Sequence, residues 1–300
     1  MSDWFIKLRF IHRRQSIIIS CLFFALLFFV YIGISIGSFD ISLYEYFFGN
    51  ANELKNKVFE QIRLPRVILA GLVGASLAIS GASLQGLFRN PLADPGLIGV
   101  SAGAALGATL IIVLGSSFVP DYIFGPLILP LSAILGSALV IYLLYLFTKG
   151  FGYRGVTYML LVGIAVNALA SVGIGVLTFI STDSELRGLT FWTMGSFGAA
   201  NWTLVVPAII VIIPTCLWLL SSSRKLDLLQ LGEPEAERLG VDVKKLKFKV
   251  IISSAVVVGV SVSLSGMIGF VGLVVPHLMR LLGGVNHSLS LIHISEPTRR

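Results

Sequence analysis

Long uncharged runs of apolar residues constrain this chain more than any other feature. Val67–Leu87 and Leu97–Val119 are two such runs. About 20 apolar residues in a helix are enough to cross the roughly 30 Å hydrocarbon core of a bilayer. The short segment between the two runs is polar and contains Arg89, Asn90, Pro91, Asp94 and Pro95. The stretch from Arg63 to Gly107 therefore predicts two membrane-spanning helices joined by a tight turn that faces water.

Six further apolar segments complete the predicted spans. They are Ser16–Phe39, Ile123–Thr148, Val156–Ser181, Thr203–Leu220, Val250–Gly266 and Ile268–Leu282. The last two divide one apolar run that is too long for a single upright span, and glycines at positions 266, 269 and 272 offer a break. The fold class predicted is all-α, a polytopic membrane helical bundle of about 8 spans that forms a single transmembrane domain over residues 1–300.

The segments between the spans are polar, and one of them is strongly charged. We expect a mixed-charge loop at Asp40–Gln61, a basic turn at Lys149–Gly155 and a charged segment at Ser221–Lys249. A short uncharged turn is predicted at Gly115–Tyr122. Thr182–Trp202 is rich in aromatic residues, which concentrate at membrane–water interfaces, and predicts a helix lying along the surface.

The basic N-terminus followed by an apolar run also fits a signal peptide. The run Ser16–Phe39 is longer than the usual 7–15 residue signal core, and no A-x-A-type site follows it. We therefore interpret it as a retained first span.

The composition excludes an ordinary soluble domain. Hydrophobic residues make up 56% of the chain, charged residues only 12%, and the mean hydropathy is +0.92, whereas soluble proteins carry about 25% charged residues. The net charge of +7 points to cytoplasmic loops rather than to nucleic acid. Cys21 and Cys216 lie in apolar runs, and the four histidines form no ligand-spaced cluster. The sequence thus predicts no disulfide, no metal site and no cofactor.

The distribution of basic residues predicts the orientation of the chain. With a cytoplasmic N-terminus, the inside segments hold 17 of the 22 Lys and Arg residues and the outside segments hold 5. Such a bias follows the positive-inside rule. It places Arg63 and Arg66 outside and Ser221–Lys249 in the cytoplasm.

Small residues line two of the predicted spans. Close backbone approach, rather than hydrophobicity, holds helices together in lipid. The two sets, each spaced by four residues, are Gly74, Ala78 and Ala82, and Gly99, Gly103 and Gly107. They predict helix packing, and alternatively a hairpin beside a translocation pathway. Asn167, the most polar residue within a span, predicts an interhelical hydrogen bond more readily than a ligand.

Two motif matches have the wrong structural context for chemistry. Gly150–Gly155 fits the dinucleotide pattern G-x-G-x-x-G but lies in a turn between spans instead of after a strand. Gly99–Gly103 fits the nucleophile pattern around Ser101 but lies on a helix-packing face. An intramembrane enzyme that uses Ser101 remains an alternative.

No predicted span carries an Asp, Glu, Lys or Arg near its middle, where secondary transporters usually bind the coupling ion. The chain also lacks a phosphate-binding G-x-x-x-x-G-K-[ST] loop. The chain must then take its transport energy from elsewhere or be passive, and the charged segment is a natural dock for a separate ATPase. The other possibility is a stand-alone carrier or channel.

Five motifs occur in order between Arg63 and His287: RLPR, SGASLQGLFRNPLADPGLIGVSAGAALGA, FWTMGSF, LGEPEAERLGV and GMIGFVGLVVPHLMRLL. In order and spacing they resemble the permease family of bacterial ABC importers for iron-siderophores, heme and cobalamin. RNPLADPGLIGVS together with FWTMGS is most similar to the heme (hemin) permeases of that family.

The resemblance implies a set of partners. Two permease subunits, expected here as a homodimer in the lipid of the bacterial inner membrane, would enclose a central pathway above two ATP-binding subunits. A substrate-binding protein would dock on the outer face, where Arg63 and Arg66 match the family's arginines that pair with its glutamates. Anchoring to lipid headgroups is the alternative role for these arginines. No nucleic-acid partner is expected.

The resemblance also assigns a coupling segment within residues 221–249. The matching residues are Gly232, Glu233, Ala236, Leu239 and Gly240. Two short helices around a glycine turn would fit a groove on the ATPase. His277 lies in the family's V-P-H motif, and we interpret it as structural.

The chain is accordingly expected to be the permease subunit of an ATP-driven importer. It would pass an iron chelate, heme or an iron-siderophore, from the binding protein into the cytoplasm and would hydrolyse no ATP itself. Residues 290–300 depart from the family, which has about ten spans. This atypical tail indicates a truncated gene or an assembly artefact.

Overall fold

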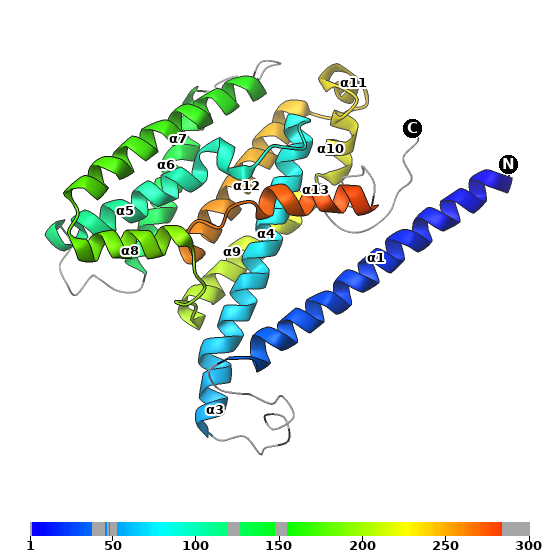
Figure 1. Cartoon of the computed structure of the whole chain (residues 1–300). Coiled ribbons are helices and arrows are strands. Elements are labelled where there is room, and N and C mark those ends of the chain that lie inside the picture. Colours follow the sequence, from blue (N-terminus) through cyan, green and yellow to red (C-terminus); the bar gives the residue numbers. More distant parts are fainter. Residues whose placement is uncertain are drawn as a thin grey trace.

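Helices form all the regular structure in the described part of the chain. The computed structural model describes residues 2–37, 46, 48, 53–118, 127–147 and 155–283. Within them the order is α1, α3, the π-helix η1, α4, the 3-10 helix η2, and α5 to α13. Figure 1 shows these helices gathered into one bundle, with α1 standing apart along one side. The predicted all-α fold class is confirmed.

Two helices form the centre of the bundle. α4 (Leu64–Phe88) and α12 (Val243–Ser265) pack against each other and share the neighbour α9 (Trp202–Leu220). Half of the most apolar window of α4 and 67% of that of α12 are buried, whereas the figure for α1 (Ser2–Ser35) is 6%. The apolar side chains of α1 thus remain mostly exposed, whereas α4 and α12 form the core of the bundle.

Three helices form a second layer on one side of α12. α5 (Val100–Phe118) packs most extensively against α6 (Ile128–Phe147) and also against α7 (Gly155–Ile180). The short α8 (Asp183–Met194) follows α7 and contacts α5. Thr182 and Glu185 form a reciprocal capping box at the start of α8, which satisfies two backbone N–H groups there. Twelve residues extend only about 18 Å, too short to span a bilayer.

The prediction of a loop at Asp40–Gln61 is wrong for its last nine residues, which are helical. Glu53–Val58 forms α3 and Phe59–Arg63 forms the π-helix η1, and both run continuously into α4. Lys57 pairs with Glu53 at 2.8 Å one turn away, and Phe59 is buried against the end of α1. These local contacts favour a helix where the mixed charges alone suggested a loop. Residues 38–45 lie outside the described part.

The turn between the first two predicted spans is only half exposed. α4 ends at Phe88, and the next residue, Arg89, adopts a left-handed conformation with φ 50°. Arg89 to Leu92 are exposed, but the chain then folds back into the bundle through η2 (Pro95–Ile98), with Pro95 and Ile98 buried. Asp94 Oδ1 accepts a hydrogen bond from Gly96 N at 2.7 Å and begins η2. The prediction of a fully water-facing turn was therefore wrong for its second half.

The break predicted near Gly266 is confirmed, with shifted boundaries. α12 ends at Ser265 and α13 (Val271–Gly283) begins after a non-helical segment that contains positive φ values at Gly266 and Phe270. α12 begins at Val243, seven residues before the predicted start at Val250. Asp242 caps it by accepting a hydrogen bond from Lys245 N at 3.0 Å. Two short helices, α10 (Ser223–Leu229) and α11 (Glu233–Arg238), precede it.

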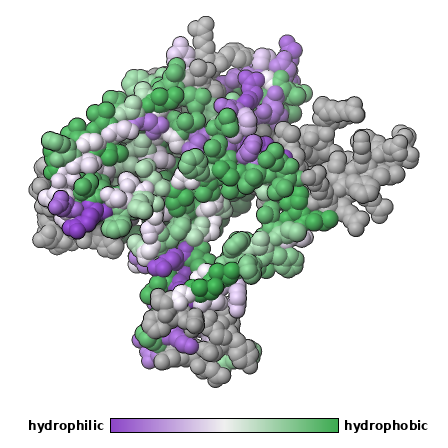
Figure 2. Space-filling view, viewed as in Figure 1, coloured by the Kyte–Doolittle hydropathy of each residue, from purple (hydrophilic) through white to green (hydrophobic). Residues whose placement is uncertain are grey.

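The described helices are long and apolar enough for a membrane protein. Six qualify as candidate spans by length and hydropathy, and Val100–Gly115 and Val271–Leu282 are shorter apolar helices. Figure 2 shows apolar colour across the bundle, with hydrophilic colour near α10 and α11 and near α3. The predicted span count stays a prediction. The turn predicted at Gly115–Tyr122 is wrong for its first four residues, because α5 continues to Phe118. Its remainder, residues 149–154 of the predicted basic turn and the atypical tail at 290–300 lie outside the described residues.

Close backbone contacts set the spacing of α4 and α13. A Cβ added to Gly81 would fall on the backbone carbonyl of Gly272, whereas one added to Gly74 would meet nothing within 4 Å. The tight contact of α4 therefore lies at Gly81, while Ala82 is buried beside it and Ala78 is half-buried.

We predict that Gly81→Ala lowers stability, since the backbone of α13 must move to admit the methyl group. The expected cost is about 1–3 kcal/mol. Gly74→Ala, in the same helix, should be neutral or stabilise by up to about 1 kcal/mol through helix propensity. Thermal unfolding of the two variants in one detergent compares them. Equal midpoints would contradict the contact.

Candidate functional site

Three helix ends meet at one end of the bundle, which we call the Arg66 end. Side-chain hydrogen bonds to backbone carbonyls join the π-helix η1, which leads into α4, to the end of α1 and to the start of α9. Trp202 Nε1 donates to the carbonyl of Glu60 at 2.8 Å. Tyr46 Oη donates to the Glu60 carboxylate at 2.7 Å, and this hydrogen bond raises the pKa of Tyr46. The Arg66 end is thus a polar surface that is held together by defined hydrogen bonds.

The two arginines that the sequence predicted to share one docking role have different environments in the structure. Arg63 is buried, and its Nη1 donates to the carbonyls of Ile34 at 2.5 Å and Ser35 at 2.9 Å. These carbonyls lie in the last turn of α1, where a positive charge is favourable. Arg66 is exposed, and its Nη2 donates only weakly to the Gly198 carbonyl at 3.3 Å. Arg66 is therefore free to reach a partner, whereas Arg63 holds α1 in place.

The charged segment, residues 221–249, lies at the opposite end of α4 and folds into a compact helical turn. Leu226 and Leu229 of α10 are buried, and Gln230 Nε2 donates to the carbonyl of Gly86 at the end of α4, at 2.9 Å. Gly232 has φ 119°, a conformation that strongly favours glycine, and it turns the chain into α11. Ala236 is fully buried, and its carbonyl accepts a hydrogen bond from Val241 N at 3.0 Å.

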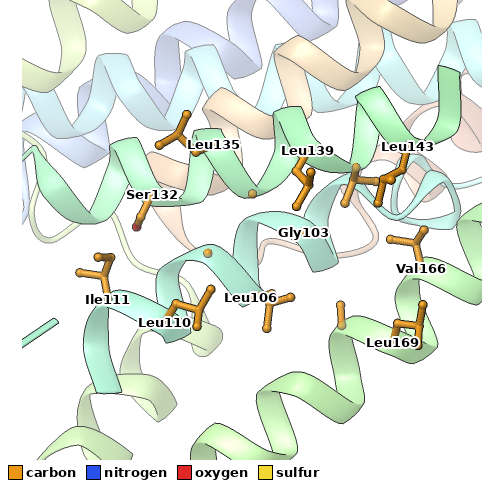
Figure 3. A pocket seen from close by; sticks show the side chains of 14 residues that line it. Gly103, Leu106, Leu110, Ile111, Ser132, Leu135, Leu139, Leu143, Val166 and Leu169 are labelled. Atoms are coloured by element: carbon orange, nitrogen blue, oxygen red, sulfur yellow. The ribbon is translucent and has the colours of Figure 1, made fainter. Parts of the chain in front are cut away.

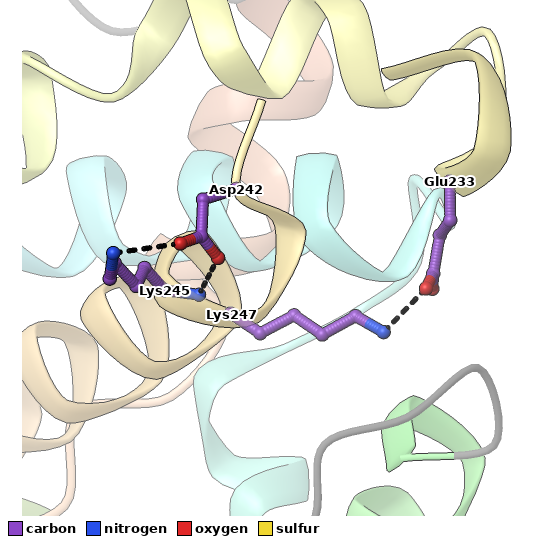
Figure 4. Close-up of polar contacts among 4 residues, drawn as sticks. All are labelled: Glu233, Asp242, Lys245 and Lys247. Carbon is purple, nitrogen blue, oxygen red and sulfur yellow. Dashed lines mark hydrogen bonds and ion pairs between the residues drawn. The ribbon is translucent and has the colours of Figure 1, made fainter. Parts of the chain in front are cut away.

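Two lysines in the first turns of α12 form very different ion pairs (Figure 4). Lys247 Nζ contacts the Glu233 carboxylate at 2.7 Å, with the two side chains only 1% and 12% exposed. Lys245 contacts Asp242 at 2.9 Å on the surface. Hydrogen bonds from the backbone and side chain of Lys245 lower the pKa of Asp242. Of these two ion pairs, the buried one ties α11 to the central helix α12.

The residues predicted for coupling divide between the two sides of this turn. Glu233 and Ala236 face inward, where they hold the turn together. Leu239 and Gly240 are exposed, and Leu239 is 57% accessible. Leu231, which the motif did not include, is 63% exposed beside them. Two large exposed leucines on a polar, folded turn are typical of a contact site for another protein.

Sequence reasoning missed Lys247 and Gln230, which fix the turn to α12 and α4. A signal for Lys247 existed in the pattern. Val243, Leu246 and Val250 are buried at spacings of three and seven residues, so Lys247 falls on the inward face of the same helix. A lysine on a buried face requires a partner, and the nearby acidic motif supplies one.

The small residues of the hairpin serve three different contacts. Gly103 and Gly107 approach the backbone of α6 at Gly136 and Ser132, where any added Cβ would clash. Gly99 precedes α5, has φ 86° and faces α7 instead. Asn167 Nδ2 of α7 donates to the Gly96 carbonyl at 3.1 Å, which anchors the buried half of the turn.

An apolar cavity of about 420 Å³ opens between α5, α6 and α7 (Figure 3). Its walls carry almost only aliphatic side chains, with one hydroxyl from Ser132. Labelled residues from all three helices, such as Leu106, Leu139 and Leu169, line it. The cavity offers shape and apolar surface but no polar group suited to chemistry.

The described residues contain no group of three or more His, Cys, Asp and Glu side chains that could hold a metal ion. Cys216 is buried and Cys21 is exposed, and neither forms a disulfide. His277 is exposed on α13. Ser101 is half-buried in the first turn of α5. Of the Gly150–Gly155 motif, only Gly155 lies within the described residues.

Comparison with known proteins agrees across most of the chain. The FecCD transport family matches residues 25–295. The hemin transport system permease protein HmuU of Yersinia pestis is 43% identical over 254 residues, covering 84% of this chain and 75% of that protein. The vitamin B12 import system permease protein BtuC of Vibrio parahaemolyticus is 40% identical over 240 residues, covering 80% and 70%.

A solved structure described as an inward-facing conformation of a metal-chelate type ABC transporter has the same fold. The TM-score is 0.81 at 36% identity, and the match covers 92% of this chain and 84% of that one. The chain belongs to the FecCD transport family. It is a membrane permease component of ABC importers, and the resemblance seen in its motifs is confirmed.

We predict that Lys247→Met destabilises the protein strongly, because it leaves the Glu233 carboxylate buried without its partner. Breaking a buried pair costs about 3–5 kcal/mol. Lys245→Met, two residues away, removes only an exposed pair and should change the unfolding midpoint little. The double variant Glu233→Leu/Lys247→Met should recover most of the loss. If Lys247→Met and Lys245→Met unfold at the same temperature in detergent, the buried ion pair does not stabilise the fold in this way.

Proposed function

We propose that this chain is the permease subunit of an ATP-driven importer that passes an iron chelate, heme or an iron-siderophore, into the cytoplasm. The observation that carries the substrate class is the 43% identity to a hemin transport permease over most of both chains. The apolar lining of the cavity between α5, α6 and α7 is compatible with a large, mostly apolar cargo. Relatives that import vitamin B12 are 40% identical, so cobalamin is the second candidate substrate.

The charged segment is the proposed docking site for a separate ATP-binding subunit. Leu231 and Leu239 offer exposed apolar side chains for its groove. The buried pair between Lys247 and Glu233 connects α11 to α12, and Gln230 connects the segment to α4. A movement imposed on the turn would then reach both central helices directly.

The Arg66 end is the proposed docking site for a substrate-binding protein on the outer face. This assignment follows the orientation with a cytoplasmic N-terminus in the bacterial inner membrane, which the distribution of Lys and Arg favours. Exposed Arg66 would pair with a carboxylate of the partner, while Arg63 would keep the end of α1 in position.

The working unit is proposed to be a dimer of two permease subunits around a shared pathway. The glycines at positions 99, 103 and 107 use their close contacts within the subunit, against α6 and α7. In this proposal they keep the helices beside the pathway closely packed, and Asn167 braces the turn that enters the bundle.

Transport in proteoliposomes tests the function. We expect uptake of heme or a ferric siderophore that requires ATP, the ATPase and the binding protein together. Leu239→Asp should lower ATP-driven uptake about tenfold or more, since it places a charge in an apolar contact. Leu239→Met, which keeps the apolar volume, should retain most of the activity.

Cobalamin uptake without iron-chelate uptake would instead assign the second candidate substrate. Uptake that persists without ATP would support a stand-alone carrier and contradict the proposal.

We predict that Arg66→Glu weakens binding of the substrate-binding protein about tenfold at low salt, through loss of one attraction and gain of one repulsion. The effect should shrink at high salt, as exposed charges are screened. Arg66→Lys keeps the charge and should bind nearly as well as the parent chain. Equal affinity of the Glu and Lys variants at low salt, measured by surface binding to nanodiscs, would overturn the docking assignment.

A further inference from the structure

A cationic corner lies where the two ends of the charged segment meet, at the end of α9 beside α12 and away from the exposed leucines around α11. Lys249 Nζ lies 5.0 Å from the centre of the Trp218 ring and donates to the Ser221 hydroxyl at 2.7 Å. Ser221 Oγ in turn donates to the Trp218 carbonyl at 2.7 Å. These contacts fix the ammonium group over an indole at the end of a helix. An ammonium group has three N–H donors, and Ser221 takes one of them.

A second cation joins this corner. Lys225 of α10 is exposed and lies four residues after Ser221, and its positive charge acts on Lys249. Among the described residues, neither lysine contacts a carboxylate within 4.0 Å. Asp242, which also feels the charge of Lys225, is paired with Lys245 at 2.9 Å. Among the described residues, the corner therefore holds two neighbouring ammonium groups that form no direct ion pair, while the Asp242 carboxylate acts on Lys225 from beyond ion-pair distance.

The corner lies at the end of a stripe that faces away from the bundle. Exposed apolar side chains follow one face of α9 at spacings of three and four residues: Val206, Ile210, Ile213 and Leu217. Trp218, which is 50% exposed, ends this stripe. On the other side of α12, exposed Phe248 contacts Tyr145 of α6 edge-on, with ring centroids 6.2 Å apart. Aromatic residues at one level of a membrane protein mark the headgroup region of the bilayer.

We propose that this corner binds the phosphate of an anionic glycerophospholipid, with the acyl chains along the exposed stripe of α9. Lys225 and Lys249 supply the counter-charge for the phosphate, and Trp218 lies at the boundary between headgroup and acyl chains. A protein partner fits less well, because the exposed leucines that mark a protein contact lie on the separate turn around α11. The proposal does not rest on the transport function.

The test uses the full chain purified in detergent and titrated with phosphatidylglycerol or phosphatidylcholine, with bound lipids counted by native mass spectrometry. We expect a preference for phosphatidylglycerol that falls about fivefold with Lys225→Gln or Lys249→Gln. Lys225 is exposed, so its substitution does not threaten folding. Lys244→Gln, an exposed lysine in the first turn of α12, is the matched control and should retain the preference.

Four outcomes would overturn the proposal. The first is equal binding of the two lipids. The second is an effect of Lys244→Gln as large as that of Lys225→Gln, which would indicate unspecific attraction. The third is that inorganic phosphate raises the unfolding temperature of the protein as much as phosphatidylglycerol does, which would indicate a site for free anions. A photo-crosslinker at position 218 that captures a protein in native membranes instead of lipid would likewise contradict it.

Discussion

Close backbone approach between helices is the constraint on which this bundle depends. Lipid tails are as apolar as leucine, so helices in a membrane associate through packing rather than through the hydrophobic effect. The contacts of Gly81 with Gly272 and of Gly103 with Gly136 bring backbones together where no side chain fits. The same glycines that look like a plain small-residue pattern thus determine which helices are neighbours.

Among the described residues, the buried charged side chains are either paired with an opposite charge or hydrogen-bonded to carbonyls at a helix end. Arg63 meets the carbonyls at the end of α1, and Lys247 meets Glu233 beneath α11. Both are buried. A buried ion pair gives little net stability compared with apolar packing, but breaking it is costly. Its consequence here is therefore geometric, since it fixes the position of a surface turn relative to the central helix.

The sequence predicted the helical spans well because their signal is strong and local. Long uncharged runs gave α4, α7 and α9 to within a few residues, and glycines gave the break after α12. Charge patterns were less reliable guides. The ions around Glu53 suggested a loop but pair along a helix, and those before Val250 belong to the first turns of α12. Whether an arginine is exposed, as Arg66 is, or buried depends on which helix end lies beside it, and no local pattern records that.

The length of α4, the first helix of the hairpin formed by α4 and α5, is important for the proposed function. α4 has 25 residues and extends about 38 Å. Arg66 lies in its first turn, and the carbonyl of Gly86 in its last turn accepts the hydrogen bond from Gln230. One uninterrupted helix therefore connects the surface around Arg66 to the charged segment, and the close contact at Gly81 holds α13 beside it. Because a packed helix resists bending, the proposed function has a direct route through α4: a displacement imposed at either end would move the other without passing through a loop.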